Sequence, residues 1–381
     1  MQHGIKRTIL SKEARQDKYE RDAIKISTYR NLTATIFQRR AESDFSTEAL
    51  ELATNLLNLN PEFYSVWNYR REILLDLIKK EPGSKKTRLE YDLKMIMAFL
   101  RRYPKCYWIW NHRVWCLQEL ATSNEANWAF ELGIVSKLLE MDARNYHGWQ
   151  YRRFVVESME DSKKHNASNS DEYATELLEI TFKEYQYTTA KINNNISNFS
   201  AWHNRSKVIP KLYRLWKSHG QNSDQYRELV TTFQSPYSIL IHELELIKTG
   251  MYMDADDTSI WLYLQWLLTD QLFVDDLNKR EDGSDGKKSF RSILDEELDI
   301  IEELNELEKD DHPENKDHVW CLKSIIVIKK LIAKELVDKE QKYRVESEIK
   351  EAFEKLIELD SLRKGRYIDQ LKEFREEVTT V

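Results

Sequence analysis

A tryptophan-centred motif recurs along the chain, and it constrains the fold more than any other feature. Each copy has a polar start and an aromatic or hydroxyl residue three positions before the tryptophan, and most copies have an arginine three positions after it. The clear copies are centred on Trp67, Trp110, Trp149, Trp202 and Trp261, and a degraded sixth copy is centred on Trp320. Recurrence at spacings of 43, 39, 53, 59 and 59 residues is typical of a repeat array.

The residues around each tryptophan predict a pair of helices. Ahead of the first copy, Ser46 is a suitable N-cap, with Glu48 in the first turn of an apolar stripe of helical spacing. Asn60-Pro61 breaks that helix, and a second stripe begins at Trp67. The chain holds only nine glycines and six prolines in 381 residues, a composition that favours long helices. The repeating unit is therefore a helix, a short turn and a second helix.

A single helical hairpin cannot bury its apolar stripe alone, so neighbouring hairpins must stack. We predict an all-α fold, a right-handed alpha-alpha superhelix of stacked helical hairpins that forms a crescent-shaped repeat array. The repeated tryptophans are expected to fill the seams between hairpins. The arginines one turn beyond them are expected to form ion pairs with acidic residues of adjacent helices. These arginines are Arg70, Arg113, Arg152 and Arg205.

We interpret residues 1–381 as a single repeat domain. It comprises an N-terminal helical arm (1–44), the repeats (about 45–335) and C-terminal capping helices (about 340–381). Two polar, charged segments, 160–172 and 278–288, are predicted to be flexible loops inserted between later repeats.

Bulk properties exclude several classes of protein. With 58 Lys and Arg against 65 Asp and Glu, the net charge of −7 argues against a nucleic-acid partner. The cysteines Cys106, Cys116 and Cys321 show neither metal-ligand spacing nor a disulfide framework, so we expect no metal in this chain. No apolar run of transmembrane length occurs, and a cytoplasmic location is expected. His242-Glu243 lacks the second histidine of a zinc-protease helix, and no other catalytic motif is found. The chain alone does not resemble a complete enzyme.

Polar residues just before two of the tryptophans are not explained by packing. Lys105 and Tyr107 lie five and three positions before Trp110. The run from Arg144 to His147 lies five to two positions before Trp149. These positions begin the second helix of a hairpin, so they are expected to share one edge of the array. Helix N-termini favour anions, and such a set can bind an anionic group. The alternative is helix capping combined with solvated charge.

The motif copies also resemble those of a known family. The first three read NPEFYSVWNYRRE, YPKCYWIWNHR and DARNYHGWQYRR, and they look like repeats of protein prenyltransferase alpha subunits. The resemblance covers roughly residues 49–268. It implies a crescent wrapped around a beta subunit, which carries the catalytic zinc and most of the isoprenoid pocket, so no cofactor is expected in this chain.

The same resemblance assigns roles to five residues. Lys105 matches the family lysine that reaches the isoprenoid diphosphate, and it is the expected catalytic residue. Tyr107, Asn145, Tyr146 and His147 match alpha-subunit residues that line the same cleft, so all five are expected to bind substrate.

Within the family, the charged opening of the chain and the segment WNYRREIL at 67–74 most resemble Rab geranylgeranyltransferase (type II) alpha subunits of the compact form. This implies transfer of geranylgeranyl from geranylgeranyl diphosphate to C-terminal cysteines of Rab GTPases, which a Rab escort protein presents. One alternative is the alpha subunit shared by farnesyltransferase and geranylgeranyltransferase type I. Another is a non-enzymatic helical-repeat scaffold, against which the tryptophan spacings exceed the ~34-residue tetratricopeptide period.

Overall fold

The computed structural model describes residues 11–220, 226–277 and 287–380. All regular secondary structure in these ranges is helical, which confirms the all-α prediction. The chain divides into two compact units, Met1–Met159 and Glu160–Val381. Residues 1–10 of the predicted arm and 278–286 of the second predicted loop lie outside the described ranges. Within those ranges, no helix combines the length and the apolar character that spanning a membrane requires.

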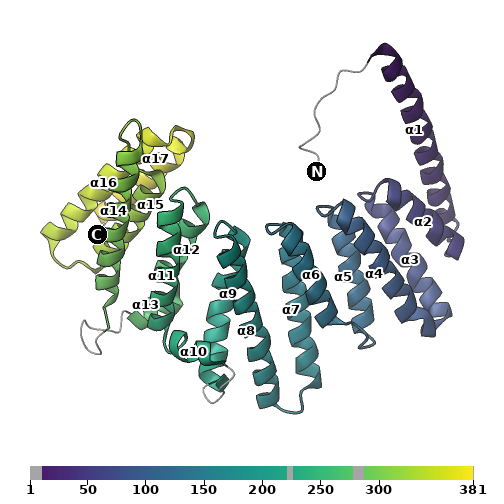
Figure 1. Cartoon of the computed structure of the whole chain (residues 1–381), viewed down its shortest axis with the longest axis horizontal. Coiled ribbons are helices and arrows are strands. Elements are labelled where there is room, and N and C mark those ends of the chain that lie inside the picture. The colour runs from purple at the N-terminus through teal and green to yellow at the C-terminus, as the bar shows by residue number, and fades with distance from the viewer. Residues whose placement is uncertain (1–10, 221–225, 278–286, 381) are drawn as a thin grey trace. The chain divides into compact units, whose positions relative to one another are not determined.

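Unit 1 consists of a long first helix followed by consecutive helical hairpins (Figure 1). Its helices are α1 (Lys12–Ala41), α2 (Thr47–Leu59), α3 (Tyr64–Lys80), α4 (Lys85–Arg102), α5 (Tyr107–Ala121), α6 (Trp128–Met141) and α7 (Tyr146–Asn166), whose last turns belong to unit 2. Helices α2 and α3 pack together, as do α4 and α5. The rings of Trp128 and Phe154, 5.8 Å apart, join α6 to α7.

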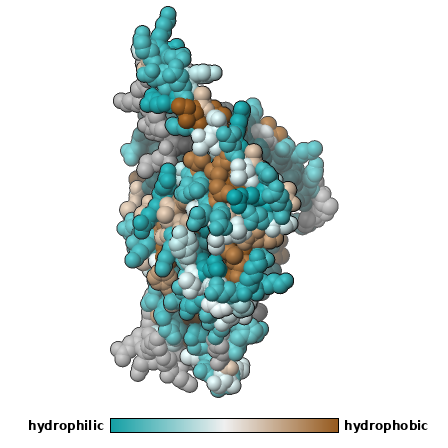
Figure 2. All heavy atoms as spheres, turned by 90° about the vertical axis from the view of Figure 1, so that its right-hand side faces the viewer, coloured by the Kyte–Doolittle hydropathy of each residue, from teal (hydrophilic) through white to brown (hydrophobic). Residues whose placement is uncertain are grey.

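The predicted start of the first repeat is confirmed. Ser46 caps α2, because its hydroxyl accepts a hydrogen bond from the backbone N–H of Ala49 at 3.2 Å. The arm meets this hairpin where Asn60 Nδ2 donates to the Tyr29 hydroxyl at 2.9 Å. Farther toward its N-terminus α1 is solvated, with Ile24 68% exposed. In Figure 2, which faces the α1 side of the view in Figure 1, hydrophilic atoms dominate and apolar residues form separate patches.

Unit 2 continues the hairpin pattern (Figure 1). Its helices are α8 (Ser170–Asn194), α9 (Phe199–Leu215), α10 (Arg227–Thr232), α11 (Pro236–Met253), α12 (Thr258–Thr269), α13 (Gln271–Leu277), α14 (Phe290–Asp311), α15 (Val319–Glu335), α16 (Lys339–Leu359) and α17 (Lys364–Thr380). The pairs α8–α9, α11–α12, α14–α15 and α16–α17 pack as hairpins.

The predicted flexible loop at 160–172 is wrong. Helix α7 continues to Asn166 and α8 begins at Ser170, so only three residues separate them. The charged side chains that indicated a loop instead form ion pairs, with Lys163 Nζ 2.5 Å from Glu176 and Lys211 Nζ 2.5 Å from Glu160. A polar run of this kind resembles an inserted loop in the sequence, although its charges have partners on neighbouring helices.

The repeated tryptophans occupy the seams, as predicted. All five are at most 5% exposed. In three of these seams, the tryptophan ring contacts the aromatic or histidine ring two positions after the next tryptophan. The ring centroids are 4.7 Å apart for Trp67–His112, 5.2 Å for Trp110–Tyr151 and 4.6 Å for Trp202–Tyr263. Tilted ring contacts of this type stabilise a seam beyond area burial alone.

The arginines of the motif also lie in these seams. Arg70 pairs with Asp92 of α4, Arg113 with Glu131 of α6 and Arg205 with Glu243 of α11, at 2.6–2.7 Å, with both partners buried. The predicted ion pairs with adjacent helices are therefore confirmed for these three arginines. The fourth, Arg152, donates from Nη1 to the Ser136 hydroxyl at 2.8 Å.

Candidate functional site

Lys105 lies in the turn between α4 and α5, and the repeat motif determines the path of that turn. The Trp110 indole Nε1 donates to the carbonyl of Pro104 at 2.9 Å, six residues upstream. The same bond recurs in every clear copy of the motif. The donors and acceptors are Trp67 to Pro61, Trp149 to Ala143, Trp202 to Ile196 and Trp261 to Ala255, at 2.6–2.8 Å. Each second helix is thus anchored to the turn before it, which fixes where Lys105 leaves the backbone.

A second hydrogen bond ties this turn to the next hairpin. Asn145 Nδ2 donates to the Pro104 carbonyl at 3.3 Å, and Asn145 Oδ1 accepts from the backbone N–H of Gly148 at 3.0 Å. Asn145 therefore caps α7 and also joins the first turn of α7 to the Lys105 turn. Its side chain is 6% exposed, so the structure places it behind the exposed edge.

His147 lies beneath two tyrosines at this edge. Its ring centroid is 4.1 Å from that of Tyr107 and 5.6 Å from that of Tyr146, in edge-on geometry in both cases. Burial lowers the pKa of His147 below its ordinary value, although a hydrogen bond with the Lys105 backbone acts in the opposite direction. A neutral imidazole that bonds to the turn supports both the Lys105 backbone and the Tyr107 ring.

The structure brings all five predicted residues together at the N-terminal ends of α5 and α7, but it divides them into two groups. Lys105 is exposed, and Tyr107 and Tyr146 are 57% and 63% exposed. Asn145 and His147 are buried and hold the turn. Direct contact with a ligand is open to the first three, and the buried pair can position them.

The electrostatics of the edge favour an anion. Helix α5 begins after Cys106 without a side-chain cap, so the partial positive charge of the helix N-terminus lies beside Lys105. Lys105 has no ion pair or side-chain hydrogen bond within the ranges that the structure describes. Arg144 is also exposed and occupies the position before Trp149 that Lys105 occupies before Trp110. Two cations and an uncapped helix start can therefore meet a multiply charged anion here.

One exposed aromatic residue of this edge was missed by sequence reasoning. Tyr64, the first residue of α3, is 53% exposed, and its ring lies 5.3 Å from that of Trp108. The signal was available, because Tyr64, Tyr107 and Tyr146 all stand three positions before a motif tryptophan. The aromatic edge of unit 1 thus runs across the starts of three successive second helices.

A separate cluster, Asp92, His112 and Cys116, holds three buried groups of metal-ligand type within 4.8 Å of one another. Both Asp92 oxygens accept from Arg70, at 2.6 and 2.7 Å. His112 Nδ1 accepts from Arg71 at 3.2 Å while His112 Nε2 meets Asp92 at 2.8 Å, so the ring is neutral with its proton on Nε2. Burial lowers the pKa of His112 to about 4 and raises that of Cys116. The guanidinium groups of Arg70 and Arg71 thus bind the Asp92 oxygens and His112 Nδ1, and their positive charge opposes a metal cation. We therefore assign this cluster to the repeat seam.

Known proteins resemble this chain over most of its length. A family described as protein prenyltransferase alpha subunit repeat matches residues 46–77, 89–120, 128–159, 182–212 and 240–271. The chain is 45% identical to the geranylgeranyl transferase type-2 subunit alpha of Candida albicans over 97% of this chain and 98% of that protein. It is 34% identical to the protein of the same name from Saccharomyces cerevisiae, over 98% of this chain and all of that protein.

Among solved structures, Candida albicans protein geranylgeranyltransferase-I complexed with GGPP resembles this chain with a TM-score of 0.57. The match covers 91% of each chain at 17% sequence identity, which shows a shared fold. The five matched repeats coincide with the motif copies that sequence reasoning identified.

Proposed function

The chain belongs to the family of geranylgeranyl transferase type-2 alpha subunits, and on this premise we propose that it acts as one half of a heterodimeric Rab geranylgeranyltransferase. The holoenzyme transfers geranylgeranyl from geranylgeranyl diphosphate to C-terminal cysteines of Rab GTPases, which a Rab escort protein presents. The observation that carries the proposal is the edge of unit 1 where exposed Lys105, Tyr107 and Tyr146 meet over the uncapped start of α5.

The reaction breaks the bond between the first isoprenoid carbon and the diphosphate oxygen, so negative charge grows on the leaving group. Lys105 stabilises that charge as a compact cation, and the α5 N-terminus adds its partial positive charge. Arg144 supplies a second cation in the equivalent position of the next repeat. Interactions that strengthen as the charge grows accelerate the chemical step rather than merely tightening binding.

The remaining residues of the site divide into contact and positioning roles. Tyr107 and Tyr146 offer hydroxyl donors and ring faces to the diphosphate end of the isoprenoid. Asn145 and His147 are positioning residues, because they bond to the Pro104 carbonyl and the Lys105 backbone. The beta subunit completes the cleft and carries a zinc ion, which holds the substrate cysteine as the nucleophilic thiolate.

A cytoplasmic location fits this role. Cys106, Cys116 and Cys321 are all unpaired, buried thiols, as expected in a reducing compartment.

Substrate preference tests the proposal against the shared alpha subunit of farnesyltransferase and geranylgeranyltransferase type I. The chain is co-expressed with candidate beta subunits, and the stable pair is assayed with geranylgeranyl diphosphate and three acceptors. These are a Rab protein with its escort protein, the same Rab alone, and a peptide ending in a C-a-a-X sequence. We expect transfer to the Rab only when the escort protein is present, and little transfer to the peptide. Efficient transfer to the peptide without escort protein would favour the shared subunit.

Failure to pair with any prenyltransferase beta subunit would favour a non-enzymatic scaffold. A pair that forms but does not react would separate assembly from catalysis, and it would refute only the catalytic part of the proposal.

A further inference from the structure

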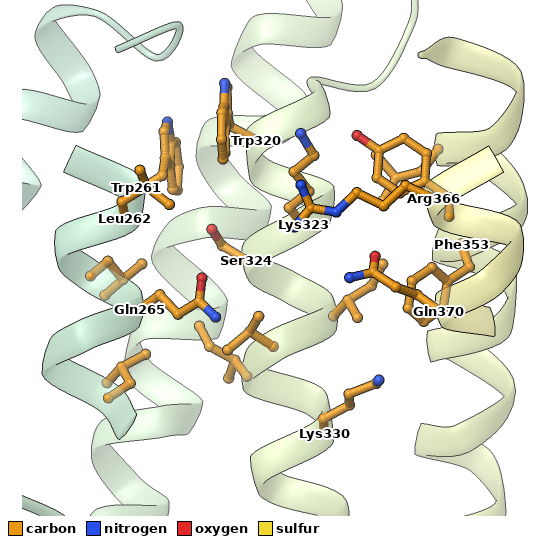
Figure 3. A pocket seen from close by; sticks show the side chains of 17 residues that line it. Trp261, Leu262, Gln265, Trp320, Lys323, Ser324, Lys330, Phe353, Arg366 and Gln370 are labelled. Carbon is orange, nitrogen blue, oxygen red and sulfur yellow. The ribbon is translucent and has the colours of Figure 1, made fainter. Parts of the chain in front are cut away.

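A pocket of about 350 Å³ lies in unit 2 between α12, α15 and α17 (Figure 3). The rings of Trp261 and Trp320 stand side by side at one end of it, and Lys323 and Arg366 approach each other near them (Figure 3). Lys330 lies at the other end, and aliphatic side chains line the space between. The pocket is wholly contained in residues 261–370, so it is independent of the site proposed in unit 1.

Both lysines of the pocket are surrounded by rings instead of carboxylates. The Lys323 ammonium lies 4.0 Å from the Trp320 ring centroid and 5.5 Å from that of Tyr367. The Lys330 ammonium lies 5.3 Å and 4.9 Å from the ring centroids of Phe353 and Phe374. Ring faces attract a cation, but they replace only part of the hydration that burial removes.

Neither lysine, nor Arg366, forms a salt bridge with any residue in the described ranges. The adjacent Lys329 shows the contrast, because its ammonium lies 3.0 Å from Glu302 and 2.8 Å from Glu348. Asp360 is the carboxylate whose charge acts on Lys323. It already accepts hydrogen bonds from the Tyr367 hydroxyl at 2.8 Å and from Arg363 at 3.0 Å.

The charged forms of these lysines are correspondingly disfavoured. Burial lowers the pKa of Lys323, and the nearby charges of Arg363 and Arg366 add to this effect while Asp360 opposes it. Burial also lowers the pKa of Lys330, while the charges of Glu377 and Glu373 oppose this effect and that of Lys334 adds a smaller contribution to it. An anion that enters the pocket would relieve both effects, because it supplies the missing partner.

The spacing of the cations limits the shape of that anion. Lys323 and Lys330 are seven residues apart on α15, which places their backbone positions about 10 Å apart along the helix axis. The ligand therefore needs an anionic group at each end and an apolar middle. A lipid or other single-headed amphiphile would leave one end unmatched.

Two carboxamides identify the ligand class further. Gln265 of α12 and Gln370 of α17 extend into the pocket from opposite walls (Figure 3). Neither side chain has a hydrogen-bond partner among the residues that the structure describes. A carboxamide offers one acceptor and two donors, which matches the N–H and C=O groups of an extended peptide backbone.

We propose that this pocket binds an extended peptide segment of a partner protein, in which apolar side chains lie between two carboxylate side chains. One carboxylate meets Lys323 and Arg366, and the other meets Lys330. Acidic residues three positions apart in a polyproline II segment lie on the same face, about 9 Å apart, which is close to the spacing of the two lysines along α15.

A labelled peptide tests the proposal directly. The probe is a fluorescein-labelled octapeptide with leucine and phenylalanine between two glutamates and glycine and serine at its flanks, titrated onto the full chain in low salt. We expect saturable binding that weakens at least tenfold with Lys323→Gln, Lys330→Gln or Arg366→Gln. Lys334→Gln is the matched control, because Lys334 is exposed on the same helix and does not line the pocket, and it should leave the affinity unchanged.

Chemical protection gives a second readout that needs no variant. The peptide should protect Lys323 and Lys330 from acetylation by an N-hydroxysuccinimide ester, as measured by mass spectrometry, while Lys334 remains reactive. A peptide with both glutamates changed to glutamine should neither bind nor protect. Equal binding by the glutamine peptide, or equal protection by octanoate, would overturn the proposal.

Discussion

The buried pair Arg205–Glu243 offers the sharpest test of how the repeats are held together. Arg205 Nε and Nη2 each donate to a Glu243 oxygen at 2.7 Å, and the Tyr263 hydroxyl donates to the same carboxylate at 2.7 Å. Both charged side chains are completely buried. Glu243→Gln keeps the size of the side chain but removes its charge and replaces one acceptor with a donor.

The cost of Glu243→Gln follows from what the substitution leaves behind. Arg205 would keep hydrogen bonds to Thr189 at 2.7 Å and to the Tyr185 hydroxyl at 3.0 Å, yet its buried charge would lose its counterion. Removing one partner of a buried ion pair typically costs about 3–5 kcal/mol. For a unit of roughly 200 residues this corresponds to a decrease in Tm of about 6–20 °C.

Thermal and urea unfolding, followed by circular dichroism, measure the effect. The matched control is Glu179→Gln, which breaks the exposed pair with Lys183 on one face of α8 and should cost only about 0.3–0.5 kcal/mol. In an Arg205→Met background, Glu243→Gln should cost much less than in the wild type, because no buried cation remains. Equal costs for Glu243→Gln and Glu179→Gln, or an unchanged cost in the Arg205→Met background, would refute the role of the seam pair.

Three further outcomes are expected. The pKa of His112 is about 6.5 in the unfolded chain but about 4 in the fold, so the unfolded chain binds more protons between these pH values. The free energy of unfolding should therefore decrease by up to about 3 kcal/mol as the pH falls from 6.5 to 4. His112→Gln should flatten the urea-unfolding free energies measured across that range. Gly250→Ala should destabilise by about 1–3 kcal/mol in thermal melts, because its Cβ would lie 2.6 Å from two isoleucine side chains, whereas Gly133→Ala, with open space, should stabilise slightly. Burial raises the pKa of Cys106 to about 11, so native alkylation at pH 8 should be at least tenfold slower than in urea, and equal rates would contradict its burial.

The fold could be predicted because its signal is local and repeated. The tryptophan copies, the N-cap at Ser46 and the helix break at Asn60-Pro61 each follow from a few neighbouring residues. The seam ion pairs were predictable in kind, since a buried arginine needs a counterion. Their acidic partners were not, because Asp92 and Glu243 lie 22 and 38 residues beyond their arginines and resemble any other helix carboxylate in the sequence.

The candidate site divides in the same way. The position of Lys105, Tyr107 and Tyr146 at one edge follows from their distance to the next tryptophan. The burial of Asn145 and His147 depends on contacts between α5 and α7, and no local pattern reports it. The prediction of a loop at 160–172 was wrong for a related reason. Charged composition alone does not distinguish a loop from a helix whose charged side chains form ion pairs with neighbouring helices.

The catalytic role of Lys105 is tested most directly by the single-turnover transfer rate of a Lys105→Ala heterodimer with geranylgeranyl diphosphate and escorted Rab. Loss of one contact to the charge that grows in the transition state should lower this rate about 10²–10³-fold, with little change in Rab affinity or in subunit assembly. Lys105→Arg should recover only part of the rate, and Lys94→Ala, which removes an exposed lysine on α4, should retain it. Transfer at the wild-type rate by an intact Lys105→Ala heterodimer would show that Lys105 is only a solvated surface charge.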